Sequence, residues 1–139
     1  MVKMTGVEAH RRRLERIQGP RAVEAVTRAL YGGAQDIQIE AQLSITRGAT
    51  SGKNHTPSTA PDPPNNDTGV LANNIEAAIT GPLKAQTSSN APYAAAQELG
   101  SEKQNLPERP YMRPAAKKAR KRVTQRVVRA VNRVVASSG

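Results

Sequence analysis

The chain has 139 residues, the length of one domain, and only 2% of them are aromatic, with no Phe or Trp. Val, Ile, Leu and Ala must therefore build a thin core, which we expect contacts between subunits to complete. The absence of Cys excludes disulfides and thiolate metal sites. The net charge is +10, and no acidic residue follows Glu108, so the whole excess lies in the region 109–139. The basic, charge-interrupted start predicts no signal peptide, and no apolar run approaches the roughly 20 residues of a membrane span.

The first part of the chain is predicted to form two helices. Met4 to Gln18 has sparse apolar positions typical of a short basic helix, and Gly19-Pro20 ends it, so residues 1–19 form a separate basic element. Pro20 can open a second, long helix that runs to about Thr46. Within it, Gly32-Gly33 allows a kink. Its apolar face is predicted from residues that recur at steps of three, four or seven, namely Val23, Val26, Leu30, Ile37, Ala41 and Ile45.

The segment 47–67 is predicted to be an extended, Pro-rich loop. It contains four prolines and two glycines among Ser, Thr and Asn, with almost no apolar residue. Such a loop cannot bury enough apolar surface to order itself. We expect it to be mobile in a free subunit and to grip a neighbouring subunit in an assembly.

The middle of the chain is predicted to hold a small antiparallel sheet. Val70 to Ala78 reads as a helical turn that passes into a strand. Ala77 to Thr80 and Leu83 to Ser88 are typical of a hairpin across Gly81-Pro82. Tyr93 to Leu99 fits either a third strand or a short helix, and a polar turn follows it.

The last element, 114–136, is predicted to be a helix opened by Pro114. Its apolar stripe consists of Ala116, Ala119, Val123, Val127, Ala130 and Val134. A basic stripe lies on one flank of it, formed by Lys118, Arg122, Arg126, Arg129 and Arg133. The fold class is therefore α+β, a small antiparallel sheet flanked by a long N-terminal helix and a basic C-terminal helix, with a long Pro-rich loop.

The basic stripe has three interpretations. It could follow a phosphate backbone and release counterions, in a non-specific contact with DNA. It could instead dock on an acidic surface of a partner protein, or simply be a solvated face. Nucleic-acid readers commonly add aromatic side chains or a groove-binding motif, and the sequence contains neither.

No motif in the sequence supports catalysis. His10 lies in a run of arginines and His55 in the Pro-rich loop, without a cluster of ligand spacing near either. The segment 48–54 is one residue too short for a phosphate-binding loop and lacks its Ser or Thr. We therefore expect a protein that is not an enzyme and has no cofactor or metal.

Three short segments, in this order, resemble a known family. The first runs from 60–64 through Thr68, Gly69 and Leu71, the second contains Tyr93, Glu98 and Gly100, and the third is Arg109, Pro110, Tyr111, Met112, Arg113 and Pro114. Together they resemble the neck or tail-completion family of long-tailed bacteriophages, typified by gene product ten of a lambda-like coliphage. The resemblance covers about residues 57–136. Tyr111 stands where the family more often has Phe, and Met1 to Ile17 has no counterpart.

The resemblance implies a structural virion protein of the neck, which joins head to tail. It implies a ring of six or twelve copies between head-closure or portal-side proteins and tail proteins, made in the bacterial cytoplasm. It assigns the residues of the three segments to assembly. Alternatives are a tail terminator or tail-tube subunit of the same particle, or a small basic DNA-binding protein.

The third segment also permits a conformational prediction. Pro110 and Pro114 fix their own φ and favour an extended chain between Arg109 and Arg113. Neighbours in an extended chain point in opposite directions. Tyr111 and Met112 would then place one side chain in the core and one outside, unless both fill the core.

Overall fold

The fold is α+β, as the sequence predicts. The computed structural model describes residues 5–47, 57–58, 60, 62–64 and 69–138. Most of the predicted Pro-rich loop, 47–67, lies outside these residues. The elements in chain order are α1 (Val7–Gln18), α2 (Pro20–Thr46), α3 (Val70–Asn73), β1 (Ile75–Gly81), β2 (Lys84–Ser89), α4 (Ala94–Leu99) and α5 (Met112–Ser138).

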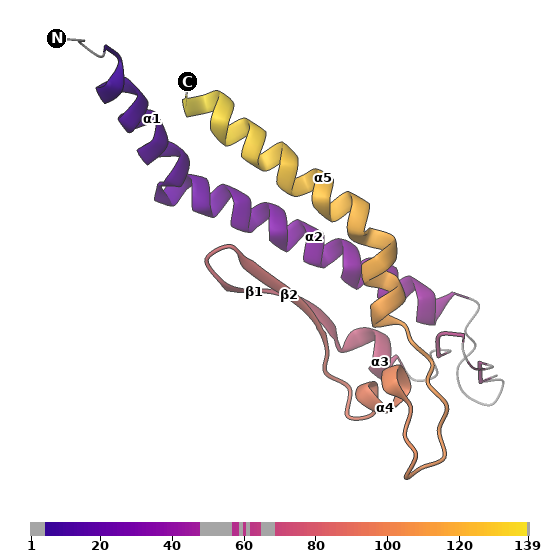
Figure 1. The fold of residues 1–139 in the computed structure, drawn as a ribbon. Helices are drawn as coiled ribbons and strands as arrows, with labels where there is room; N and C mark the ends of the chain where they lie inside the picture. The colour runs from indigo at the N-terminus through magenta and orange to yellow at the C-terminus, as the bar shows by residue number, and fades with distance from the viewer. Residues whose placement is uncertain (1–4, 48–56, 59, 61, 65–68, 139) are drawn as a thin grey trace.

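Helix α2 is the central layer of the molecule. Helix α5 lies along one side of it, and the β1–β2 hairpin covers another side (Figure 1). Three hydrogen bonds join the hairpin to α2. The Thr87 hydroxyl donates to the Ala34 carbonyl at 2.7 Å, and the Leu83 N–H donates to the Thr27 hydroxyl at 3.0 Å. The Gln38 side-chain amide donates to the Ile75 carbonyl at 2.9 Å. The predicted apolar face of α2 is confirmed, since its residues are buried or half-buried.

The Gly32-Gly33 pair does not interrupt α2, which remains one helix across both residues. Gly33 instead allows α5 to approach closely. A Cβ atom built at Gly33 would lie 2.8 Å from Cγ1 of Val123 on α5, closer than side chains pack in proteins. At Gly32 the nearest atom is the end of the flexible Arg126 side chain, at 3.1 Å.

The predicted hairpin is confirmed and begins slightly earlier than expected. Ile75 lies opposite Ser89 and Ile79 opposite Ala85, with an irregularity between Ile79 and Gly81. Leu83 lies in the turn with φ of 56°. A non-glycine residue rarely adopts this left-handed conformation, so the turn is strained at Leu83.

Two predicted helix starts were wrong, and one open alternative is decided. The first helix begins at Val7 and not at Met4, after Gly6 in a left-handed conformation with φ of 83°. The segment 93–99 contains the short helix α4, so the alternative of a third strand is excluded. Helix α5 begins at Met112, two residues before Pro114. A proline within the first turn costs no hydrogen bond, because these N–H groups have no intrahelical acceptor.

The core lies at one end of the molecule, where α2 ends and α5 begins. Its buried residues are Ala41, Ile45, Leu71, Ala72, Ile75, Ala91, Ala94, Tyr111 and Ala115. The core is thin, as expected: its largest fully buried side chains are those of Tyr111, Ile45 and Ile75. The predicted apolar stripe of α5 was wrong at its first position, since Ala116 is exposed and Ala115 is buried.

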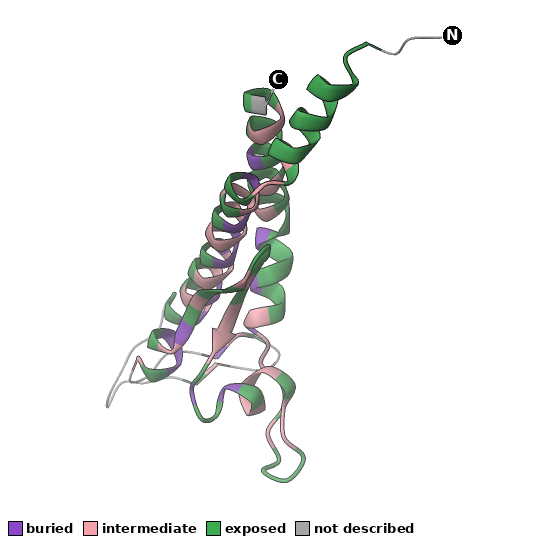
Figure 2. Ribbon diagram, turned by 90° about the vertical axis from the view of Figure 1, so that its left-hand side faces the viewer, coloured by how far each residue is buried: buried purple, intermediate pink, exposed green. Residues whose placement is uncertain are grey.

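Helix α1 lies at the opposite end and contributes nothing to the core. It has no buried residue, and Figure 2 shows it exposed along nearly its whole length. The predicted apolar positions Val7 and Leu14 are 51% and 43% exposed.

Candidate functional site

The start of α5 is held by the carboxylate of Glu98 on α4. One carboxylate oxygen, Oε2, accepts hydrogen bonds from the backbone N–H groups of Tyr111 at 2.7 Å and Met112 at 2.9 Å. The other, Oε1, accepts from the N–H of Arg113 at 2.9 Å and from its side-chain Nε at 3.0 Å. The first N–H groups of a helix have no acceptor within it. Glu98 therefore caps α5 from a different element.

The environment of Glu98 favours its charged form. Burial raises the pKa of the carboxyl, but the hydrogen bonds from three backbone N–H groups and from Arg113 outweigh it, so the pKa of Glu98 lies below its ordinary value. The cap is consequently a carboxylate at neutral pH. Its contribution to stability persists until the pH falls through this lowered pKa.

Tyr111 connects this cap to the core. Its side chain is fully buried in the cluster with Ile45, Leu71 and Ile75. Its hydroxyl forms a hydrogen bond of 2.7 Å with the Ser89 hydroxyl at the end of β2. Burial raises the pKa of Tyr111, and the bond to Ser89 opposes this.

The prediction of an extended Arg109–Arg113 segment was wrong beyond Tyr111. Met112 and Arg113 already belong to α5, because the Glu98 carboxylate satisfies their N–H groups. Neighbouring side chains in a helix do not alternate between faces. Met112 packs against the same core cluster as Tyr111, so both large side chains serve the core.

The three segments of the resemblance meet at this junction, which we call the α5 junction (Leu71, Glu98, Tyr111 and Arg113). Leu71 comes from the first segment, Glu98 from the second, and Tyr111 and Arg113 from the third. Leu71 is 4% exposed, and Arg113 also donates to the Glu98 backbone carbonyl at 2.9 Å. Five of the twelve predicted assembly residues thus stabilise the subunit itself: Leu71, Glu98, Tyr111, Met112 and Arg113.

The other residues of the three segments lie around the junction. Gly69 precedes α3 with φ of 83°, and Gly100 has φ of 76° where a Cβ atom would lie 3.0 Å from the Leu106 carbonyl oxygen. Both positions therefore require glycine. The Arg109 N–H donates to the Gln97 carbonyl at 2.6 Å. Pro110 is half-buried, Tyr93 and Pro114 are exposed, and Thr68 lies outside the described residues.

The basic stripe is partly neutralised within the subunit. Arg126 forms two hydrogen bonds with the buried Asp36 carboxylate, at 2.5 and 3.0 Å, and this contact raises the pKa of Arg126. Glu40 pairs with Arg122 at 2.5 Å and with Lys118 at 3.8 Å. Three of the five members of the stripe therefore face α2.

The remaining two members, Arg129 and Arg133, are exposed and form no ion pair with the part of the chain that the structure describes. The sequence contains a signal for the pairing of the other three members with α2. Two acids four residues apart on α2 match two arginines four residues apart on the antiparallel α5.

Among residues 5–47, 57–58, 60, 62–64 and 69–138, no cluster of three or more His, Asp or Glu side chains could hold a metal ion. None of the helices described is long and apolar enough to cross a membrane. Comparison with known protein families, with characterised proteins and with solved structures finds no match for this chain.

Proposed function

We propose that the chain is a structural protein of a tailed bacteriophage, a ring-forming neck or tail-completion component that joins head to tail. The observation that carries the proposal is the α5 junction. The resemblance rests on three segments spread over more than forty residues of sequence. All three supply side chains to one cap and one small core, so they share one structural purpose.

The incomplete burial of the subunit supports assembly. Helix α1 buries no residue, and the hairpin has only two strands in the described part of the chain. A two-stranded hairpin leaves both outer edges unpaired, and such edges readily pair with another chain. Contact between unlike edges of successive subunits is head-to-tail, the type of contact that closes into a ring.

Leu83 at the tip of the hairpin is the best candidate for such a contact. It combines a strained φ of 56° with a side chain that is 50% exposed. Asn or Gly would suit this turn better, so the backbone conformation does not explain why a leucine stands here. Contact with a neighbouring subunit would explain it.

Leu83→Asn tests this proposal without weakening the fold. The variant relieves the turn, so its melting temperature should equal or exceed that of the parent, while mass photometry should show fewer rings of six or twelve copies. Gln86→Asn, also exposed on the hairpin, is the matched control and should assemble normally. A parent protein that stays monomeric, alone and in the particle, would overturn the proposal.

A tail terminator or tail-tube subunit of the same particle is the alternative from the same class. Copy number in purified particles separates the two, because tube subunits greatly outnumber neck subunits. The structure supports the DNA-binding alternative less than the sequence alone does. Three members of the basic stripe, Lys118, Arg122 and Arg126, form ion pairs with α2. The proposed partners are further copies of the chain, head-closure or portal-side proteins, and tail proteins.

A further inference from the structure

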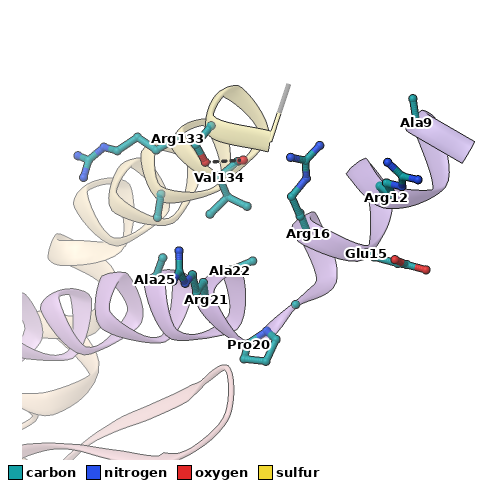
Figure 3. Close-up of a pocket in the computed structure, with 13 residues that line it drawn as sticks. Ala9, Arg12, Glu15, Arg16, Pro20, Arg21, Ala22, Ala25, Arg133 and Val134 are labelled. Atoms are coloured by element: carbon teal, nitrogen blue, oxygen red, sulfur yellow. Dashed lines mark hydrogen bonds between the residues drawn. The ribbon is translucent and has the colours of Figure 1, made fainter. Parts of the chain in front are cut away.

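A wide cleft opens at the end of the molecule opposite the core. Helix α1 forms one wall, and the first turns of α2 and the last turns of α5 form the floor and the opposite wall (Figure 3). Its volume is about 1290 Å³. The break at Gly19, whose backbone is extended with φ of −75° and ψ of 173°, directs α1 away from α5 and so creates the opening.

The lining of the cleft is positively charged. Arg12, Arg16, Arg21 and Arg133 line it, against one acidic residue, Glu15. Figure 3 shows Arg16 reaching into the space between α1 and α5, and Arg21 pointing from α2 toward α5. Neither arginine forms an ion pair within the described residues. The carboxylate of Glu15 lies 3.8 Å from the guanidinium of Arg11, which does not line the cleft.

The floor of the cleft, between these arginines, is apolar and consists of small side chains. It is formed by Ala22 and Ala130, which are buried between α2 and α5, and by Ala25 and Val134, which are half-buried. Small side chains allow another backbone to approach closely, as the axes of packed helices lie about 8–10 Å apart. An α-helix is about 10 Å across with its side chains and rises about 1.5 Å per residue.

We propose that this cleft binds an acidic amphipathic helix of a partner protein. The apolar face of the helix would cover Ala25 and Val134, and Asp or Glu on its flanks would pair with Arg16 and Arg21. Arginine recognises carboxylates through paired hydrogen bonds. The bound helix would also cover the inner face of α1, which nothing in the described subunit buries.

An apolar floor distinguishes this partner from nucleic acid. A phosphate backbone would use the arginines but gain nothing from the alanines between them, and the lining contains no aromatic side chain on which a base could stack. Binding of such a helix is inferred from the single subunit and does not rest on the proposed ring.

Fluorescence anisotropy with a synthetic peptide tests the proposal. The probe is a labelled peptide of about 14 residues with Leu and Ala on one helical face and Glu on both flanks. Its control has the same composition in scrambled order. The full chain should bind the amphipathic probe at least about tenfold more tightly than the control, since both carry the same charge.

Variants locate the binding in the cleft. Arg16→Gln with Arg21→Gln should weaken binding about tenfold. Arg120→Gln with Lys121→Gln, which removes the same charge from an exposed part of α5, should have less than a twofold effect. Ala25→Phe fills the floor without changing charge and should also weaken binding, while circular dichroism verifies that each variant is folded.

Three results would overturn the proposal. The first is equal affinity for the amphipathic and scrambled peptides, or no binding of either. The second is equal loss in the two charge variants, which would indicate attraction by net charge alone. The third is tighter binding of a duplex DNA of about 20 base pairs that depends on Arg16 and Arg21 but not on Ala25, which would make the cleft a phosphate site.

Discussion

Replacing Glu98 by Gln should destabilise the subunit by removing the cap of α5. Gln has nearly the same size but only one acceptor oxygen, and its NH₂ group would face N–H donors. Of the four N–H···O bonds to the carboxylate, two are lost. Each hydrogen bond to a charged group contributes about 1.5–3 kcal/mol. Because Arg113 is largely exposed, we expect a total loss of about 2–4 kcal/mol.

This loss is a large share of the roughly 5–15 kcal/mol that stabilises a domain. For a chain of this size it should lower the melting temperature by about 5–15 °C. Thermal unfolding followed by circular dichroism measures it. Glu102→Gln is the control, since Glu102 is exposed in the following loop, and it should change stability by less than about 0.5 kcal/mol.

The difference in stability between the parent and Glu98→Gln should depend on pH. The pKa of Glu98 is lowered in the folded state, so its stabilising effect is complete above the ordinary Glu pKa of about 4.3 and is lost as the pH falls through the lowered value. The difference between parent and variant should therefore be large at pH 7 and shrink in acid. Equal melting temperatures of parent, Glu98→Gln and Glu102→Gln at pH 7 would refute the assignment of Glu98 as the cap.

Three further changes test the packing. Gly33→Ala should lower the free energy of unfolding by about 1–3 kcal/mol, because the added methyl group overpacks against Val123. Gly32→Ala should be within about 1 kcal/mol of the parent. Adding Val123→Ala to Gly33→Ala should restore part of the lost stability. Arg126→Gln should cost about 1–3 kcal/mol in urea unfolding by leaving Asp36 buried without its partner, whereas Arg129→Gln should be neutral. Tyr111→Ala should cost about 3–5 kcal/mol of stability and prevent ring formation. Tyr111→Phe should cost only about 0.5–1.5 kcal/mol, for the lost hydrogen bond to Ser89. Rings formed by Tyr111→Ala in electron micrographs would contradict this prediction.

The helices and the hairpin were predictable because their signals are local. The apolar residues of α2 repeat with the helical period, and Gly19-Pro20 marks its start. The start of α5 was not predictable in the same way. Pro114 resembled a first helical residue, but the true start depends on Glu98, which lies 14 residues before Met112 and on a different helix.

The role of the predicted site residues depended on tertiary structure. The sequence singled out Leu71, Glu98 and Tyr111 through the resemblance, yet gave no indication that they lie together in the interior. Burial of Tyr111 follows from the meeting of five elements, α2, α3, β1, α4 and α5, and the periodicity of no single element encodes that meeting. The basic stripe was visible as a pattern, but its pairing with α2 required knowing that the two helices are neighbours.

The pairing of α2 with α5 also constrains how the subunit folds. Asp36 and Arg126 are 90 residues apart in sequence, and contacts between such distant residues slow folding because a long loop must close first. Residues of α2 emerge from the ribosome well before those of α5, so the apolar face of α2 remains exposed until α5 has been synthesised and packs against it. A nascent chain of this kind is prone to aggregation at that stage, and we expect fragments that end before Tyr111 to be insoluble or degraded.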